Sequence, residues 1–294
     1  MLERPQAALF RALRDLGYRI DSPNNKLPAR IYGGGPRPGA CEVSIQESSQ
    51  FASALLLSSR VGGWRIGTQG ANLDESPYVV MTEQLVQAFP RAGGSFQIEP
   101  DASSGSYFWA ADALLGRAGG AAPRISVAHW PASGWQIDAE FPRFLPLPSV
   151  VSRQHHLGDS IMTAIVLAPT MPHPTRFTDL GRLRVQECER VAALRTELTR
   201  CGARVEEEGD TLTVYPGPLT GAVIETYGDH RMAMCFAILG LKVPGMRIKN
   251  PSCVKKTFPN FFQKLAGAPP HGLGVRIVDP DSRRILSSEE LLAL

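Results

Sequence analysis

The sequence predicts an α/β protein made of repeated βαβαββ units, in which two kinds of helix alternate with short strands. Helix starts marked by Ser or Asp recur along the chain at the spacing of a supersecondary unit. Amphipathic helices that stop at Gly, and strands of alternating polarity after them, fill the intervals. Helices in these positions would pack together, with the sheets facing outward.

The first kind of helix is apolar and begins at residues that favour an N-cap. The four predicted starts are Ser48-Ser49-Gln50, Asp101-Ala102-Ser103-Ser104, Gly158-Asp159-Ser160 and Gly228-Asp229-His230-Arg231. The stretches that follow them, such as IMTAIVLAP and MAMCFAILGL, are apolar on every side. A helix of that kind is buried, so these stretches are predicted to form the core.

The second kind of helix is amphipathic and leads into strands. One is expected from Pro5 to Gly17, and a clearer one runs to Gly202. A strand from Ala203, a turn at Gly209-Asp210 and a second strand over residues 211–214 should follow the latter.

Two segments are expected to depart from the repeat. Residues 141–152 contain three prolines and are predicted to run as a loop where the pattern calls for a helix. Residues 267–294 open with Gly-Ala-Pro-Pro-His-Gly and fall outside the pattern. This tail either adds a strand over residues 274–278 or is loosely attached.

Composition narrows the class of protein. The chain of 294 residues is 43% hydrophobic and 20% charged, as in globular proteins of about two domains. A net charge of +3 without basic runs argues against a nucleic-acid partner. No apolar run approaches the ~20 residues of a membrane span. Five cysteines without a CxxC pair and six histidines without ligand spacing predict reduced thiols, a cytoplasmic location and no metal.

Three polar stretches are candidates for an anion site at converging helix starts. They are Asp229-His230-Arg231, the run Arg182–Arg190 with three arginines and two glutamates, and Lys255-Lys256. Each also has a structural explanation. On a helix, Glu187 and Arg190 would share a face as a surface ion pair. Asp229 alone would be an N-cap, and the lysines a solvated loop.

Two tracts resemble the EPSP synthase (3-phosphoshikimate 1-carboxyvinyltransferase) family. They are residues 225–234, ETYGDHRMAM, and residues 250–259, NPSCVKKTFP. Shorter matches lie at residues 48–51, 76–78, 101–104 and 185–190, in the family's order, from Glu3 to about Ala266. The DHRMAM and KTFP pair is specific, and it argues against the sibling UDP-N-acetylglucosamine enolpyruvyl transferases.

The resemblance implies the family's fold, two inside-out α/β lobes that close over substrate. Residues 1–98 would form an incomplete N-terminal lobe on the shikimate 3-phosphate side. Residues 99–266 would form the C-terminal lobe on the phosphoenolpyruvate side, and 267–294 a tail outside the family pattern. Compared with the family, the chain begins just after a phosphoenolpyruvate-binding Arg and lacks the Lys-Ser, Arg-cluster and Asn-Ala-Gly-Thr segments.

The family transfers an enolpyruvyl group from phosphoenolpyruvate to shikimate 3-phosphate without a metal or organic cofactor. By matched position, the resemblance implies that Asp159 is the base and that Glu187 and Lys256 handle protons near phosphoenolpyruvate. Anion binding is implied for Arg190 and Arg231. The shikimate 3-phosphate site would consist of Ser48, Ser49, Gln50, Tyr78 and Gln186.

The chain departs from the family at three positions. Gln186 stands where the family has Lys, and Arg182 where it has Asn. Glu75 replaces a Ser that helps to bind the 3-phosphate. A carboxylate there opposes anion binding unless it turns away or is protonated.

Three hypotheses follow. The chain is a transferase, alone or with a further segment on another chain; or it is a catalytically impaired remnant that binds a phosphorylated ligand. The third, a relative of the RNA 3′-phosphate cyclases, is disfavoured by the near-neutral charge and the lack of a nucleotide-binding Gly loop. An incomplete lobe would leave apolar helix faces and sheet edges bare, so a second chain or self-association is expected to cover them.

Overall fold

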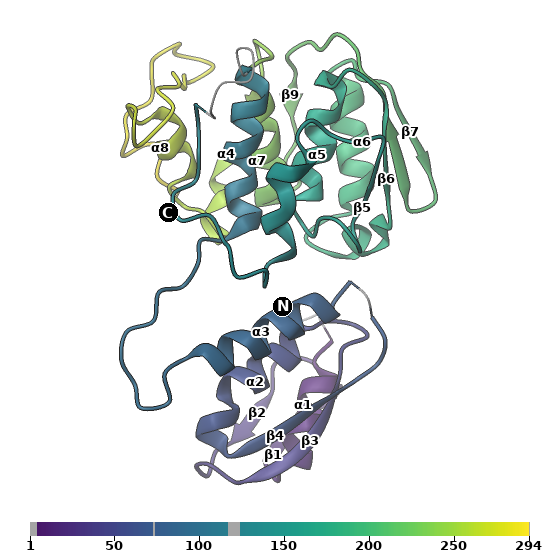
Figure 1. The fold of residues 1–294 in the computed structure, drawn as a ribbon, viewed down its shortest axis with the longest axis vertical. Coiled ribbons are helices and arrows are strands. Elements are labelled where there is room, and N and C mark those ends of the chain that lie inside the picture. The colour runs from purple at the N-terminus through teal and green to yellow at the C-terminus, as the bar shows by residue number, and fades with distance from the viewer. Residues whose placement is uncertain (1–4, 73, 117–123, 294) are drawn as a thin grey trace. The chain divides into compact units, whose positions relative to one another are not determined.

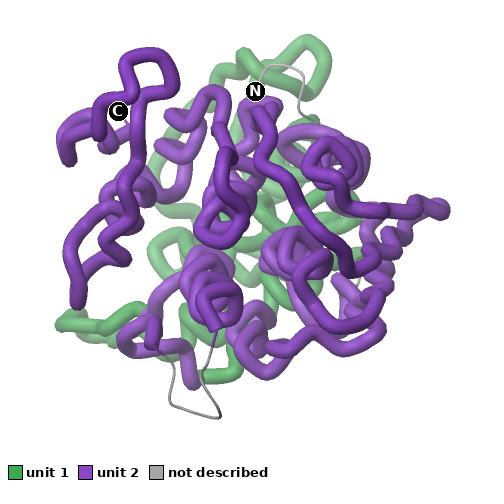
Figure 2. The backbone as a smooth tube through the Cα atoms, turned by 90° about the horizontal axis from the view of Figure 1, so that it is seen from above, with its two compact units in different colours: residues 1–98, 133–136 green, residues 99–132, 137–294 purple. Residues whose placement is uncertain are grey.

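The computed structural model describes residues 5–72, 74–116 and 124–293, and the chain divides into two compact units. Unit 1 comprises residues 1–98 with 133–136, and unit 2 comprises residues 99–132 with 137–294 (Figure 1; Figure 2). Each unit has a hydrophobic cluster of its own. Both combine helices with short strands, so the predicted α/β class is confirmed.

Unit 1 contains short strands and amphipathic helices. In chain order its elements are α1 (Ala7–Asp15), β1 (Arg19–Asp21), β2 (Arg30–Tyr32), β3 (Gly39–Ser44), α2 (Gln50–Gly62), β4 (Trp64–Gln69) and α3 (Ser76–Ala88). The predicted first helix ends as expected just before Gly17, which has a φ of +85°. That backbone conformation suits glycine, which lacks a Cβ.

A parallel strand–helix–strand crossover forms the centre of unit 1. Strands β3 and β4 pair in parallel with Gly39 opposite Trp64, and α2 connects them. Strands β1 and β2 pair antiparallel, in a separate two-stranded sheet. Side chains from α1, α2 and β3, including Leu16, Val43 and Leu55, are buried together. The segment that leads into α2 is thereby held at the carboxyl end of β3.

Unit 2 holds the other three predicted apolar helices. Its elements are α4 (Ala102–Leu115), η1 (Ile137–Phe144), β5 (Val150–Ser152), α5 (Ile161–Leu167), η2 (Ala168–Thr170), β6 (Thr175–Thr178), η3 (Leu180–Val185), α6 (Arg190–Arg200), β7 (Val205–Glu208), β8 (Thr211–Val214), β9 (Val223–Ile224), α7 (His230–Leu239), β10 (Arg247–Ile248), η4 (Pro251–Lys256) and α8 (Phe261–Ala266). The η elements are 3-10 helices.

Helices occupy the centre of unit 2. All seven residues of α5 are buried, and α5 packs against α4, α6 and α7 (Figure 1). A four-stranded sheet of order β5-β6-β8-β7 pairs β5 with β6 in parallel and the remaining neighbours antiparallel. The prediction that the helices pack together agrees with this arrangement. Because α4, α5 and α7 converge, so do the segments that precede them.

Two local predictions need correction. The Pro-rich segment is not a continuous loop: residues 137–144 form the 3-10 helix η1, and residues 150–152 form β5. Pro142 lies inside η1, where it contributes no backbone N–H donor, and the helix ends two residues later at Phe144. The structural explanation that puts Glu187 and Arg190 on one helix also fails, since η3 ends at Val185 and α6 begins only at Arg190. Gln186 between them has φ −91° and ψ −126°, which interrupts the helix.

The tail folds back along α8. Leu291 and Ala293 are buried in the hydrophobic cluster of unit 2, and the Ala293 N–H donates to the Pro259 carbonyl at 2.9 Å. The expected strand over 274–278 is not formed, and a single bridge joins Val278 to Ile285. Across the described ranges, no helix combines the length and apolar character needed to cross a membrane.

Candidate active site

The start of α7 joins two helices of unit 2 through a buried carboxylate. Asp229 is fully buried and caps α7, accepting the Arg231 N–H at 2.8 Å. The same carboxylate accepts from Arg190 Nε at 2.6 Å and from the Arg190 NH2 group at 3.3 Å. Arg190 is the first residue of α6 and is 2% exposed. Asp229 is therefore both the predicted N-cap and the partner of a buried guanidinium.

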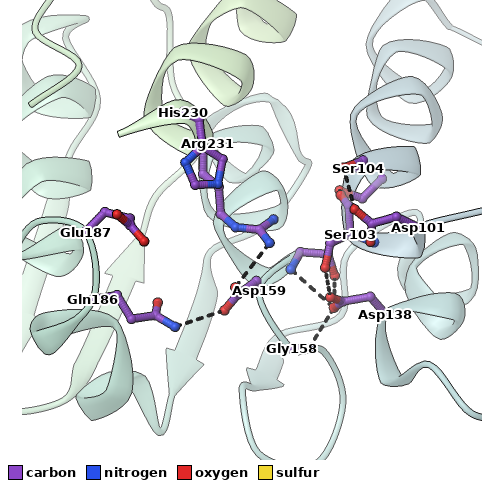
Figure 3. A network of polar contacts seen from close by, with 12 residues as sticks. Asp101, Ser103, Ser104, Asp138, Gly158, Asp159, Gln186, Glu187, His230 and Arg231 are labelled. Carbon is purple, nitrogen blue, oxygen red and sulfur yellow. Dashed lines mark hydrogen bonds and ion pairs between the residues drawn. The ribbon is translucent and has the colours of Figure 1, made fainter. Parts of the chain in front are cut away.

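Asp159, which precedes α5, lies among three arginines. Its Oδ1 is 3.1 Å from the Arg153 NH2 group. Its Oδ2 is 3.1 Å from the Arg231 NH2 group, as Figure 3 shows. Arg190 NH1 is 4.0 Å from Oδ2. Gln186 Nε2 donates to Oδ1 at 3.5 Å, while its Oε1 accepts from Arg190 NH1. The starts of α5, α6 and α7, together with Arg153 after β5, thus bring Asp159 and three arginines together.

The charges of this cluster shift the proton affinity of its acids. Burial raises the pKa of Asp159, but the charges of Arg231, Arg153 and Arg190 outweigh it and hold that pKa well below its usual range. Burial also opposes ionisation of Asp229, yet the hydrogen bond from Arg190 keeps its pKa low. Both carboxylates are ionised at neutral pH. The guanidiniums and carboxylates compensate one another, as buried charges require.

Glu187 and Lys256 form an ion pair beside the cluster. Glu187 follows Gln186 in the bend before α6, and Lys256 is the last residue of η4. The expectation that Glu187 and Arg190 share a helix face is wrong, because Glu187 precedes the helix and its carboxylate contacts Lys256 Nζ. The Lys256 side chain is half-exposed, so its ammonium group is open to solvent.

Two neighbouring side chains are uncharged at neutral pH. Burial and the positive charge of Arg231 lower the pKa of His230 to about 4, so its ring is neutral. Burial, together with the negative charge of Asp229, raises the pKa of the Cys188 thiol to about 12. A nucleophilic cysteine needs a depressed pKa, so Cys188 is not one. All five cysteines are free thiols.

Two residues of the network carry no signal in the sequence. Arg153 is 3% exposed and follows β5, and Asp138 is 4% exposed in the first turn of η1. Both belong to or adjoin the Pro-rich segment, which has no periodicity or motif. Their partners lie in other segments of the chain. The roles of Arg153 and Asp138 therefore follow only from their contacts in the folded protein.

The remaining predicted residues lie in unit 1. Ser48 Oγ accepts the Gln50 N–H at 3.2 Å, and Ser49 is the N-cap of α2. Tyr78 lies in the first turn of α3. Glu75 turns toward α2: its Oε2 accepts the Ser49 N–H at 2.5 Å, and the residue is 5% exposed. Glu75 therefore does not turn away from the helix start; its carboxylate caps α2 itself.

Taken together, unit 2 is a helix-centred α/β body in which an acid and several cations gather at the helix starts, an arrangement suited to an enzyme that handles anionic substrates. The sequence matches the family model of EPSP synthase (3-phosphoshikimate 1-carboxyvinyltransferase) over residues 1–92 and 150–265. The chain belongs to the EPSP synthase family.

Relatives with that enzyme name support the assignment. The 3-phosphoshikimate 1-carboxyvinyltransferase of Pseudomonas savastanoi pv. phaseolicola is 37% identical over 94% of this chain and 71% of its own length. The one of Opitutus terrae is 35% identical over 90% of this chain and 69% of its own length. The chain thus spans about 70% of such relatives.

Solved structures show the same fold. An EPSP synthase from Acinetobacter baumannii matches with a TM-score of 0.60 at 19% identity, covering 89% of this chain and 70% of that one. The enolpyruvyl transferase NikO from Streptomyces tendae matches with a TM-score of 0.55 at 13% identity over 89% and 71% of the two chains. The expected EPSP synthase-like architecture is confirmed.

Proposed function

We propose that this protein transfers the enolpyruvyl group of phosphoenolpyruvate to the 5-hydroxyl of shikimate 3-phosphate. The hydroxyl oxygen bonds to C2 of phosphoenolpyruvate while a base takes the hydroxyl proton and an acid protonates the methylene carbon. The methyl carbon then loses a proton and the bond between C2 and the phosphate oxygen breaks. These two events regenerate the double bond and release phosphate. The reaction therefore needs a base, an acid and cations for the anionic groups.

The arginine-held Asp159 is the observation that carries this proposal. In the free protein, Arg153 and Arg231 hold its pKa low, which makes it a weak base. A carboxylate or phosphate bound by Arg190 and Arg231 would compete for those guanidiniums. The pKa of Asp159 would then rise toward that of a usable base. Binding of phosphoenolpyruvate would thus prepare the base for the hydroxyl proton.

Glu187 and Lys256 are assigned to the second proton transfer. Their direct ion pair allows one proton to pass between a carboxylate and an ammonium group next to Gln186. The exposure of Lys256 gives the pair access to water, from which its proton is replaced. We therefore assign to this pair the protonation and deprotonation of the methylene carbon of phosphoenolpyruvate.

The shikimate 3-phosphate ligands are assigned to Ser48, Ser49, Gln50, Tyr78 and Gln186. Glu75 opposes anion binding at Ser48 and Ser49, because its carboxylate accepts the Ser49 N–H that an anion would use. Binding of the 3-phosphate at this helix start would require displacement or protonation of Glu75. We therefore expect weak binding of shikimate 3-phosphate compared with phosphoenolpyruvate.

Release of phosphate from the two substrates tests the function. The intact chain is expected to release phosphate only when phosphoenolpyruvate and shikimate 3-phosphate are both present. Calorimetric titration with each substrate distinguishes the alternatives. Binding of shikimate 3-phosphate without turnover would favour an impaired, ligand-binding relative. A protein that neither binds shikimate 3-phosphate nor releases phosphate would contradict the proposal.

A second proposal concerns an apolar face of unit 1. Leu57 and Val61 lie four residues apart on one face of α2 and are 58% and 78% exposed, and Val80 of α3 is 52% exposed. We propose that another copy or a second chain covers these side chains. Light scattering of the purified protein tests this idea. A monomer that binds little hydrophobic dye would contradict it.

We place the reaction in the cytoplasm. Five free thiols, three of them buried, suit a reducing compartment. Retention of activity in millimolar reductant, and its loss under oxidising conditions, would agree with this location.

A further inference from the structure

Asp138 is a buried carboxylate that binds both sides of Asp159. Its Oδ1 accepts the Gly158 N–H at 2.7 Å and the Ser160 N–H at 3.2 Å, so it contacts the residue before and the residue after Asp159 (Figure 3). The Ser160 hydroxyl donates to the same oxygen at 2.5 Å. Two backbone bonds that flank one residue fix the position of its Cα.

The other oxygen of Asp138 ties this segment to a different helix. Its Oδ2 accepts from the hydroxyl of Ser103, in the first turn of α4. Asp138 itself belongs to η1. One carboxylate therefore joins η1, the start of α4 and the segment that leads into α5.

A structural cap alone does not require this arrangement. Burial of a carboxylate is costly, and here it raises the pKa of Asp138 against the opposing effect of the Ser103 and Ser160 hydroxyls. Asp101 shows the cheaper solution, capping α4 from a local position by accepting the Ser103 N–H at 3.0 Å. The segment 158–160 instead uses a residue 20 or more positions away. What the distant carboxylate adds is a fixed backbone at Asp159.

Precision at Asp159 matters because its side chain lies between two fixed cations. Its two oxygens contact Arg153 and Arg231 at 3.1 Å each. A displacement of about 1 Å would break one of these contacts, and a misplacement of that size at a reacting group can cost ~100-fold in rate.

We propose that Asp138 is a positioning residue, which holds the Asp159 carboxylate in its reactive position through the N–H groups of residues 158 and 160. The inference rests on the proposed function, because Asp159 is the base of that reaction. Asp138 is 4% exposed and its oxygens accept from Ser103, Gly158 and Ser160, so we assign it no contact with substrate.

The test is a double-mutant cycle in the intact protein, measured as phosphate release from phosphoenolpyruvate and shikimate 3-phosphate. Asp138→Asn keeps one acceptor oxygen but removes the charge, and we expect kcat to fall about 10- to 100-fold with little change in either KM. In the Asp159→Asn background the same change should cost less than about twofold, because the group it positions is gone.

Asp112→Asn is the matched control. Asp112 is also a buried carboxylate, 2% exposed, and it accepts the N–H groups of Arg124 and Ile125 at 2.8 and 3.1 Å. We expect it to lower thermal stability as much as Asp138→Asn does, with kcat unchanged. If Asp138→Asn does not fold, Ser160→Ala, which removes one bond to Asp138, takes its place, with a severalfold loss of kcat expected.

The outcomes separate the two proposals. No phosphate release by the unmodified protein would overturn the proposed function. Active protein in which Asp138→Asn lowers kcat no more than Asp112→Asn, or equally with and without Asp159, would overturn the positioning role alone.

Discussion

The starts of α2 in unit 1 and α5 in unit 2 are closed in the same way but surrounded differently. In both, the N-cap is a Ser whose own side chain makes no capping bond. Instead its N–H donates to a buried carboxylate from a distant segment, Glu75 for α2 and Asp138 for α5, 26 and 22 residues away. The surroundings differ, because Asp159, which is held by Arg153 and Arg231, lies next to the start of α5.

The comparison shows what a buried carboxylate does in each place. In unit 2, Asp138 fixes the backbone at Asp159, and the arginines compensate the charge of Asp159. In unit 1, Glu75 occupies the helix start to which we assign the 3-phosphate. Under the proposed function, the same device therefore fixes the proposed base in one unit and closes the proposed anion site in the other.

The largest effect is expected when the charge balance of unit 2 is broken. Arg190→Ala would leave the fully buried Asp229 without its guanidinium and should destabilise the protein by about 3–5 kcal/mol. Chemical denaturation measures the loss. Arg143→Ala, which removes a surface pair with Glu140, is the control and should change stability by less than about 0.5 kcal/mol. Equal effects would show that the buried pair is not special.

Opening the helix start of unit 1 should give a smaller effect, on binding. Glu75→Gln keeps an oxygen for the Ser49 N–H but removes the negative charge. We expect shikimate 3-phosphate to bind about tenfold more tightly, since a charge-assisted bond to the helix start becomes available. Calorimetry gives the affinity, and the affinity for phosphoenolpyruvate should stay the same. Unchanged or weaker binding of shikimate 3-phosphate would refute the idea that Glu75 closes the site.

Protonation of His230 should lower the stability of the protein at acid pH. Its pKa is lowered to about 4 from an ordinary value near 6.5 by burial and by Arg231, with Arg190 and Lys256 adding to the effect and Asp229 opposing it. The unfolded chain therefore binds a proton between about pH 6.5 and 4 that the folded protein does not. Stability falls as pH falls through this window, by about 2 kcal/mol between pH 7 and pH 5.

His230→Gln should remove this part of the pH dependence, and denaturation at the two pH values measures it. The depressed pKa of Asp159 affects stability only at lower pH. A carboxylate with a depressed pKa loses its stabilising effect only as pH falls below about 4. A variant that still loses about 2 kcal/mol between pH 7 and pH 5 would assign the effect to another group.

Features encoded within a few residues were predictable from the sequence. The four helix starts lie where the sequence places N-cap residues, although only Asp101 and Asp229 make the capping bond with their own side chains. Gly202 marks the end of α6. Asp159, Arg190 and Arg231 were found because they lie in recognisable tracts at those starts. Strand β8 also matches its prediction of residues 211–214.

Features that depend on distant partners were not predictable. Arg153 and Asp138 lie in or beside a segment whose prolines obscure its pattern, and their roles depend on contacts with other segments. Glu75 departs from the family's Ser, which the sequence shows. That its carboxylate caps α2 depends on the packing of α3 against α2, which the sequence does not show. The helical pairing considered for Glu187 and Arg190 is not formed because Gln186 leaves helical geometry.

The turnover number of Asp159→Asn tests the central claim most directly. With both substrates saturating, kcat for phosphate release should fall ~10²- to 10⁴-fold relative to the unmodified protein, as expected for the loss of a general base. Asp112→Asn, measured beside it, should keep its rate. An Asp159→Asn protein that turns over as fast as the Asp112→Asn control would contradict the account, because the acid among the arginines would then have no part in the chemistry.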